Sequence, residues 1–289
     1  MKNEEVLEKV ERELKLRGFS PHTIKAYLQY IQDLFDFTGK LHSKILFEDI
    51  KNFLENLSIE KNYSGSSVTL VKSAIRFYYE KLLKKYPVSE IEVAPREEKL
   101  PVVLTREEIK RIMNAATKLR DKLIIQTMYS CGLRVSEATS LKVEDLDFSD
   151  MTGTIRRGKG KKDRRIFLSR TLVKTIPSYL KTKKIPSVFL FSKSNGMPYT
   201  TRSFQLIIKG VAERAGITKK VHSHMFRHAF GTHLVEDGCD IVRVQGMMGH
   251  SSLETTRLYV TLSKEQFKGI KNPLDSLLEE QGMSEDEKE

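Results

Sequence analysis

The stretch between Tyr86 and Pro101 limits the folds open to this chain more than any other feature of its sequence. It holds three prolines among charged residues, Pro87, Pro95 and Pro101. Because proline removes a backbone donor and its ring clashes with the preceding helical turn, no helix can run through this stretch. We therefore predict a domain at residues 1–90, a linker at 91–101, a second domain at 102–278 and an acidic tail at 279–289.

The first domain shows the apolar spacing of helices. Apolar residues recur one turn apart between residues 6 and 14, as on the buried face of a helix. Ser20 before Pro21 is a typical helix start, because the hydroxyl caps the first turn and proline is favoured at the first helical position. Further helices are predicted at 47–57 and 66–83. The expected unit is a compact four-helix bundle.

The second domain mixes helices with a small β-sheet. Thr105 and Glu108 have the spacing of a capping box, and an apolar helix is predicted at 121–129. Residues 153–156 and 164–168 have the character of strands around a basic loop, and a third short strand is predicted at 188–191. The pattern is helical again from 201 to about 278. The whole chain is thus predicted to be mainly α with a small β-sheet.

The positive charge is concentrated in one part of the chain. The formal net charge is +12, and residues 96–278 hold 34 Lys and Arg against 18 Asp and Glu, whereas residues 1–95 hold 15 against 14. Such an excess on one domain is typical of a protein that binds a polyanion such as DNA, and a solvated basic surface is the alternative. On the first domain, Lys25, Lys72 and Arg76 are candidates for a basic face.

Several functions are disfavoured. No stretch approaches the roughly 20 apolar residues that a membrane span needs, and the first ten residues do not resemble a signal peptide, so we expect a cytoplasmic protein. Cys131 and Cys239 have no partner at zinc-ligand spacing and are interpreted as reduced packing residues. With no phosphate-binding G-x-x-x-x-G-K-[ST] loop and no acidic cluster suited to magnesium, we expect no metal, nucleotide or other cofactor.

Five motifs carry the groups needed to cut a DNA phosphodiester without a metal: a nucleophile, cations around the phosphate and an acid for the leaving oxygen. In chain order they are GLRVSE at 132–137, GKG at 158–160, HMFR at 224–227, GH at 249–250, and Tyr259.

Each motif has a structural explanation when it is taken alone. Arg134 and Glu137 could be a helical surface pair. His224 could be a partly buried histidine beside a solvated Arg227, and His250 a helix-capping or core histidine. Lys159 could be a solvated loop lysine, and Tyr259 is one of ten tyrosines.

Taken together, the motifs resemble the tyrosine recombinases, also called the lambda-integrase family, and among them the Xer recombinases of bacteria and archaea. The resemblance covers essentially the whole chain and is carried by the stretches GLRVSEATSL, GKGKKDRRIFL, HMFRHAFGTHL and MMGHSSLETTRLY. It implies that the first domain is a core-binding domain. Together with an α+β catalytic domain, this core-binding domain would close a clamp around duplex DNA.

The resemblance also implies a role for each motif residue. Tyr259 is the expected nucleophile, which becomes joined to a 3′ phosphate, while Lys159 protonates the departing 5′ oxygen. Arg134 and Arg227 hold the nonbridging oxygens of the phosphate, a role suited to guanidinium groups, which keep their charge. His224 assists proton removal from the tyrosine. His250 contacts the phosphate, and Glu137 supports Arg134.

The implied substrate is double-stranded DNA with paired inverted half-sites, recombined by a homo-oligomer, expected to be a tetramer on two DNA sites, in chromosome dimer resolution. An apolar stripe at 264–278 would dock on a neighbouring subunit or, alternatively, fold back on its own domain. The other functions considered are a type IB topoisomerase, a phage or mobile-element integrase, and a non-enzymatic architectural DNA-binding protein.

Overall fold

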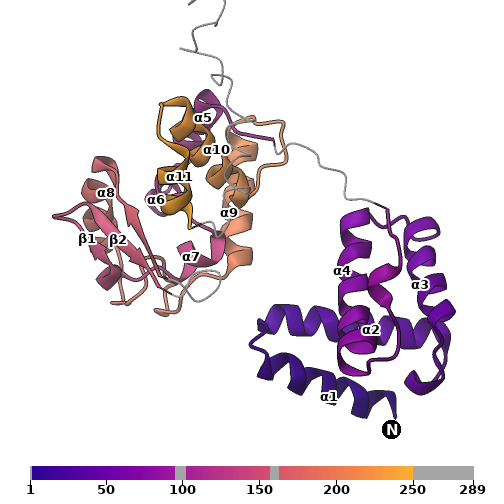
Figure 1. Cartoon of the computed structure of the whole chain (residues 1–289). Coiled ribbons are helices and arrows are strands. Elements are labelled where there is room, and N and C mark those ends of the chain that lie inside the picture. Colours follow the sequence, from indigo (N-terminus) through magenta and orange to yellow (C-terminus); the bar gives the residue numbers. More distant parts are fainter. Residues whose placement is uncertain (1, 95–101, 157–162, 250–289) are drawn as a thin grey trace, which may run out of the picture. The chain divides into compact units, whose positions relative to one another are not determined.

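A computed structural model describes residues 2–94, 102–156 and 163–249 (Figure 1). The chain divides into two compact units, Met1–Lys99 and Leu100–Glu289. Several predicted features lie outside the described residues: Lys159, His250, Tyr259, the apolar stripe at 264–278, the acidic tail, and the predicted linker from residue 95 onward.

The first unit is the four-helix unit predicted from the sequence. Its helices are α1 (Asn3–Leu16), α2 (Pro21–Thr38), α3 (Phe47–Ile59) and α4 (Gly65–Arg76), and α4 continues as a π-helical segment, η2 (Phe77–Leu82), with short 3-10 turns at η1 (His42–Lys44) and η3 (Val88–Glu90). The hydroxyl of Ser20 accepts a hydrogen bond from the backbone N–H of Thr23 at 3.1 Å, as expected for the predicted cap. The helices enclose an apolar core of their own.

Two of the three cations expected to form a basic face on this unit have local partners instead. Lys72 Nζ donates to the carbonyl oxygens of Ser89 and Ile91 within the unit. Arg76 Nε donates to Glu80 at 3.2 Å. Of the three candidates, Lys25 is exposed and has no such partner among the described residues. The expected face is therefore weaker than the sequence suggests, because local carbonyl and carboxylate groups compete for its charges.

The second unit is mainly helical with one small sheet. Its elements are α5 (Arg106–Ala115), α6 (Leu119–Ser130), α7 (Val135–Ser140), η4 (Val143–Asp145), β1 (Leu146–Asp147), β2 (Thr152–Ile155), β3 (Arg164–Phe167), α8 (Arg170–Lys181), α9 (Thr201–Arg214), α10 (Ser223–Glu236) and α11 (Ile241–Met248). The capping box is present, since Glu108 N donates to Thr105 Oγ1 and Thr105 N donates to Glu108 Oε2. The predicted fold class is confirmed.

The sheet differs from the prediction in its third strand. It is antiparallel in the order β1-β2-β3, with Gly153 paired to Ile166. The segment predicted as the third strand, 188–191, forms only an isolated bridge between Phe189 and Lys142. Leu190 and Phe191 are fully buried in the core, so their apolar character reflects burial and not strand pairing.

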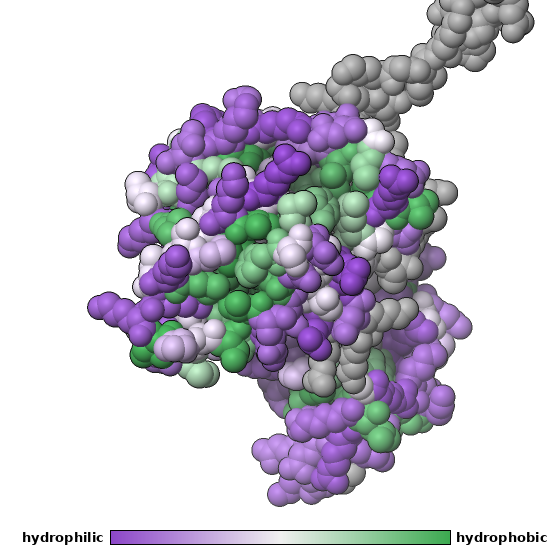
Figure 2. Space-filling view, turned by 90° about the vertical axis from the view of Figure 1, so that its left-hand side faces the viewer, coloured by the Kyte–Doolittle hydropathy of each residue, from purple (hydrophilic) through white to green (hydrophobic). Residues whose placement is uncertain are grey.

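Helix α6 is the centre of the second unit. It packs against α5, α8, α9 and α10, and in Figure 1 the sheet and α8 lie on one side of the unit with α5, α9 and α10 on the other. On the face seen in Figure 2, apolar side chains gather in a connected area within a mostly hydrophilic surface. In the part of the chain that the structure describes, no helix is long and apolar enough to span a membrane.

Candidate active site

A glycine turn brings the first motif against α10. Helix α6 ends at Ser130, and Gly132 follows in the left-handed conformation, with φ of 56°. A Cβ atom added at Gly132 would lie 2.3 Å from Cδ1 of Phe230, a residue of α10. Both the backbone angle and the close ring require glycine here. The turn thus places Arg134, at the start of α7, close to α10.

Arg134 is held by Glu137 through two of its groups. Its backbone N–H donates to Glu137 Oε2 at 2.8 Å, and its Nη1 donates to Glu137 Oε1 at 2.7 Å. The side chain of Arg134 is 19% exposed and that of Glu137 is 5% exposed, so the pair is not on the surface. Within the described residues, Nε and Nη2 of Arg134 have no acceptor. These donors are therefore available to an anion.

Glu137 is ionised despite its burial. Burial alone would raise the pKa of Glu137, but the charge of Arg164, the N–H of Arg134 and the Arg134 guanidinium together hold this pKa below its ordinary value. A buried carboxylate that stays charged fixes the orientation of the arginines around it.

Arg227 is nearly buried, with 3% of its surface exposed. Its Nη1 donates to the carbonyl oxygen of Gly132 and its Nη2 to that of Met248, each at 2.5 Å. One guanidinium therefore joins the Gly132 turn to the end of α11.

His224 lies in the first turn of α10, three residues before Arg227, and is partly exposed to solvent. Partial burial lowers the pKa of His224, and the nearby charges of Arg227, His222 and Arg134 lower it further, while Glu137 opposes them. The neutral imidazole is therefore favoured, which is the form that can accept a proton.

Arg164 was not singled out from the sequence, although the structure places it between these groups. Its Nη2 donates to Glu137 Oε2 at 2.7 Å, and its Nη1 donates to the carbonyl oxygen of Met247 at 2.8 Å. The sequence held a signal for it: Arg164 and the buried Ile166 alternate with exposed residues along β3, so the arginine faces inward. An arginine that faces inward needs hydrogen-bond acceptors or an opposite charge beside it.

The remaining motif residues lie outside the described part of the chain, next to elements that are described. In the sequence, Lys159 lies between β2 and β3. The pair of these strands that is nearest to it in the chain is Ile155 with Arg164. His250 directly follows Gly249, which ends α11 in the left-handed conformation. Of the seven predicted site residues, the structure brings together Arg134, Glu137, His224 and Arg227.

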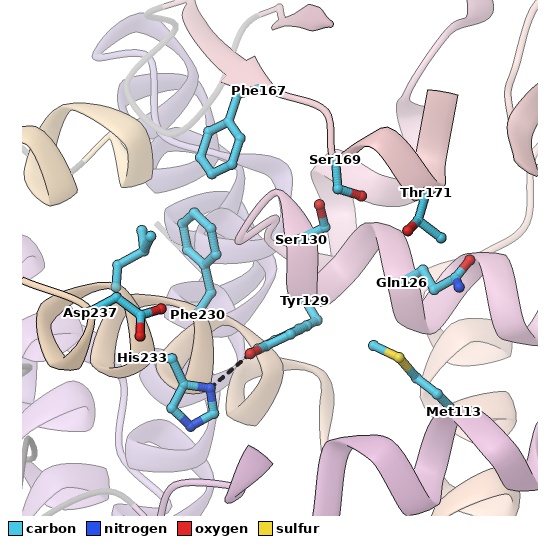
Figure 3. Close-up of a pocket in the computed structure, with 11 residues that line it drawn as sticks. Met113, Gln126, Tyr129, Ser130, Phe167, Ser169, Thr171, Phe230, His233 and Asp237 are labelled. Atoms are coloured by element: carbon cyan, nitrogen blue, oxygen red, sulfur yellow. Dashed lines mark hydrogen bonds between the residues drawn. The ribbon is translucent and has the colours of Figure 1, made fainter. Parts of the chain in front are cut away.

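A separate pocket of about 370 Å³ lies beside α6 and α10, and none of the predicted site residues lines it. In Figure 3 the rings of Phe167 and Phe230 lie next to each other in its wall, with centroids 5.9 Å apart, and Tyr129 OH meets His233 Nδ1 at 2.9 Å. Gln126 Oε1, in the pocket wall, is buried and has no hydrogen-bond partner among the described residues. The lining of the pocket is largely apolar and includes a few polar side chains.

No group of three or more His, Cys, Asp or Glu side chains is placed to hold a metal ion in residues 2–94, 102–156 and 163–249. What these residues do assemble is a cluster of guanidinium donors around one buried carboxylate, with a neutral imidazole beside it. Such an arrangement can hold an oxyanion and take up a proton.

Comparison with known proteins identifies the family. The model of the phage integrase family matches residues 102–266, and that of a phage integrase N-terminal SAM-like domain matches residues 6–87. Tyrosine recombinase XerA of Thermococcus kodakarensis is 34% identical over 271 residues, which cover 91% of this chain and 93% of that protein. Tyrosine recombinase XerD of Listeria monocytogenes is 31% identical over 277 residues, covering 88% and 92%.

Solved structures agree. A crystal structure of XerA recombinase is similar with a TM-score of 0.54 and 29% identity, covering 90% of this chain and 95% of that one. XerH recombinase bound to a palindromic difH substrate has a TM-score of 0.74 at 22% identity, covering 91% and 82%, which is a likeness of fold. The family models and the near full-length relatives confirm the resemblance noted in the sequence: the chain belongs to the phage integrase family of tyrosine recombinases, which includes the Xer enzymes.

Proposed function

We propose that this chain is a site-specific recombinase that cuts and rejoins double-stranded DNA through a covalent phosphotyrosine at Tyr259, without a metal ion or ATP. The observation that carries the proposal is the bond from Arg227 Nη1 to the carbonyl oxygen of Gly132. This bond ties the HMFR helix to the turn that leads into Arg134, so the two motif arginines come from one rigid arrangement. Two fixed guanidinium groups are suited to one phosphate.

In this proposal Arg134 and Arg227 bind the nonbridging oxygens of the scissile phosphate. Arg134 would use its Nε and Nη2, while its Nη1 stays on Glu137. Arg227 would act from a nearly buried position that is fixed by its bonds to the carbonyl oxygens of Gly132 and Met248. Because their positions are set before DNA arrives, little reorganisation is needed as charge develops on the phosphate.

The covalent step would proceed as follows. Tyr259 Oη bonds to phosphorus as the bond from phosphorus to the 5′ oxygen breaks. The tyrosine proton passes to neutral His224, and the departing 5′ oxygen takes a proton from Lys159. His250 would be a further donor to the phosphate. The products are a 3′-phosphotyrosyl strand and a free 5′ hydroxyl, and a hydroxyl from a second strand can reverse the step.

The expected substrate and assembly follow the Xer relatives. The XerH structure is of a recombinase on a palindromic difH substrate, and we propose that this chain likewise acts on paired inverted half-sites. From the relatives named Xer, we infer that the chain forms a homotetramer on two DNA sites. Its inferred role is chromosome dimer resolution in the cytoplasm.

We further propose that the apolar pocket beside α6 and α10 receives the stripe at 264–278 of another subunit. The pocket offers the rings of Phe167 and Phe230 as an apolar surface, and the stripe carries Phe267, Ile270 and Leu274 at helical spacing. An amphipathic helix buries its apolar face in such a groove. This contact would couple the subunits.

Covalent attachment to DNA tests the enzymatic proposal. Purified protein is mixed with duplexes that carry candidate half-sites, in excess chelator, and protein-linked strands are separated on a denaturing gel. The unmodified chain and Tyr199→Phe, a control tyrosine that bonds Arg120 in the second unit, should form the adduct. Tyr259→Phe should bind DNA and form none.

Other outcomes of this test point to other functions. A Tyr259→Phe adduct would mean that another residue attacks. DNA binding without any adduct from the unmodified chain would favour a non-enzymatic architectural protein. A phage or mobile-element integrase shares the chemistry and is distinguished by its DNA site.

A further inference from the structure

Arg164 is the point at which three segments of the second unit meet. Its side chain is only 8% exposed. The Nη2 atom donates to Glu137 Oε2, which belongs to α7, and the Nη1 atom donates to Met247 O, which belongs to the last turn of α11. The residue itself lies on β3. A single guanidinium thus joins β3, α7 and α11.

Arg164 shares its carboxylate with the motif arginine. Glu137 Oε2 accepts hydrogen bonds from Arg164 Nη2 at 2.7 Å and from the backbone N–H of Arg134 at 2.8 Å, while Oε1 accepts from Arg134 Nη1. The backbone and the side chain of Arg134 are therefore both fixed by a carboxylate that Arg164 holds. Movement of Arg164 would be passed directly to Arg134.

Arg164 also fixes the end of α11. The last carbonyl groups of this helix are bound in turn, Met247 O by Arg164 and Met248 O by Arg227. A Cβ added at Gly249 would lie 2.5 Å from Arg164 Cδ. The left-handed turn at Gly249 therefore closes directly over the Arg164 side chain, which requires glycine at this position.

We propose that Arg164 is a positioning residue for DNA cleavage. It holds Arg134 in place through Glu137, and with its other terminal nitrogen it fixes the end of α11. The inference rests on the proposed function of Arg134. Arg164 does not need to touch the DNA. Lysine cannot replace it fully, because one ammonium nitrogen stands where the guanidinium has two separate terminal nitrogens for two acceptors.

A purely structural ion pair is the competing explanation, and the pH dependence of cleavage separates the two. Glu137 faces Arg134 at the start of α7, Arg164 on β3 and His224 on α10. Removing Arg164 takes away the charge that most opposes the effect of burial on the Glu137 pKa, so this pKa should rise. Protonated Glu137 would then release Arg134 as the pH falls. His224 titrates in the unmodified chain too, so a difference between the two pH profiles isolates Glu137.

The experiment measures single-turnover adduct formation at saturating DNA, from about pH 5 to about pH 9, together with DNA affinity and thermal unfolding. Arg164→Met should form adduct about 10- to 100-fold more slowly, bind DNA within a few fold of the unmodified chain, and lose further rate on the acid side. Adding Glu137→Gln to Arg164→Met should remove that extra acid loss. The control is Arg165→Met, the exposed neighbour on β3, which should keep the rate of the unmodified chain at saturating DNA.

Arg164→Lys keeps the proposal testable if Arg164→Met does not fold. It retains the charge that ionises Glu137 but not both bonds, so it should be roughly tenfold slower with no added acid loss. Equal rates for Arg164→Lys or Arg164→Met and the unmodified chain would overturn the proposal. So would a loss in Arg164→Met that is uniform with pH and unaffected by Glu137→Gln. Absence of adduct from the unmodified chain would instead contradict the proposed function.

Discussion

Nη1 of Arg227 donates to the carbonyl oxygen of Gly132 at 2.5 Å, which joins residues 95 positions apart in the chain. Gly132 also lies under the ring of Phe230, three residues after Arg227 on the same helix. The turn before Arg134 is therefore shaped by α10 from two directions. Its conformation depends on the absence of a side chain at residue 132.

Gly132→Ala should destabilise the second unit strongly. The left-handed backbone costs an L-residue about 1–2 kcal/mol, and the clash with Phe230 adds about 1–3 kcal/mol of overpacking. Gly216→Ala is the matched control, because Gly216 also has a positive φ of 67° but nothing lies within 4 Å of its Cβ position. Thermal unfolding measures both. Equal losses for the two variants would show that the Phe230 contact is unimportant.

The stability of the second unit should depend on pH through His228. Burial, followed by the charges of His224, His222 and Arg227, lowers the pKa of His228 from 6.5 to about 4. Between these values the unfolded chain binds a proton that the folded chain does not, so stability should fall as the pH drops from 6.5 toward 4. The expected contribution is about 1–3 kcal/mol.

His228→Gln should flatten this dependence, because glutamine does not titrate. The free energy of unfolding of the second unit is measured across that range, with His22→Gln, an exposed histidine of the first unit, as the control. If His228→Gln and the unmodified chain lose stability equally on acidification, His228 is not the group responsible.

Local signals in the sequence predicted the elements well. Ser20, Pro21 and the Thr105–Glu108 box act within one helical turn, and the structure has helices starting at each. The prediction of a strand at 188–191 was wrong, because burial selects apolar residues in a segment whether or not that segment joins the sheet. The two-residue strand β1 is too short to show any periodicity.

The site was predictable in its residue types but not in its contacts. The sequence indicated Arg134, Glu137, His224 and Arg227, yet the burial of Arg227 depends on carbonyl groups of Gly132 and Met248, far from it in the chain. Glu137 and Arg164 are 27 positions apart, so no local pattern links them. Only packing of α7, α10 and α11 around β3 brings these charges together.

Lys159 should act as the general acid in cleavage. Lys159→Ala is expected to cut normal DNA slowly but to recover on a substrate with sulfur in place of the 5′ bridging oxygen, because a thiolate leaves without being protonated. Arg134→Ala should not recover, since its loss removes stabilisation of the phosphate charge. Adduct formation on both substrates measures this, and equal rescue of both variants would contradict the assigned roles.

The last prediction concerns coupling between subunits. Truncation before Lys264 removes the apolar stripe, and the proposed contact with the pocket beside α6 and α10 would be lost. Binding to a single DNA site should stay within a few fold, because the arginines and the first unit are intact. Recombination between two sites should be abolished, because the subunits can no longer assemble and time their cuts.

A pocket variant should reproduce the truncation if the stripe binds there. Leu234 lines the pocket. Leu234→Asp places a charge where an apolar helix would pack, and burial of an unpaired charge has a large free-energy cost. Leu206→Asp on α9 is the control, because Leu206 is 54% exposed and does not line the pocket. Two-site recombination and single-site binding are measured for all three variants. A truncated chain that recombines at the full rate would show that the stripe does not couple the subunits, and a fully active Leu234→Asp beside an inactive truncation would place its docking site elsewhere.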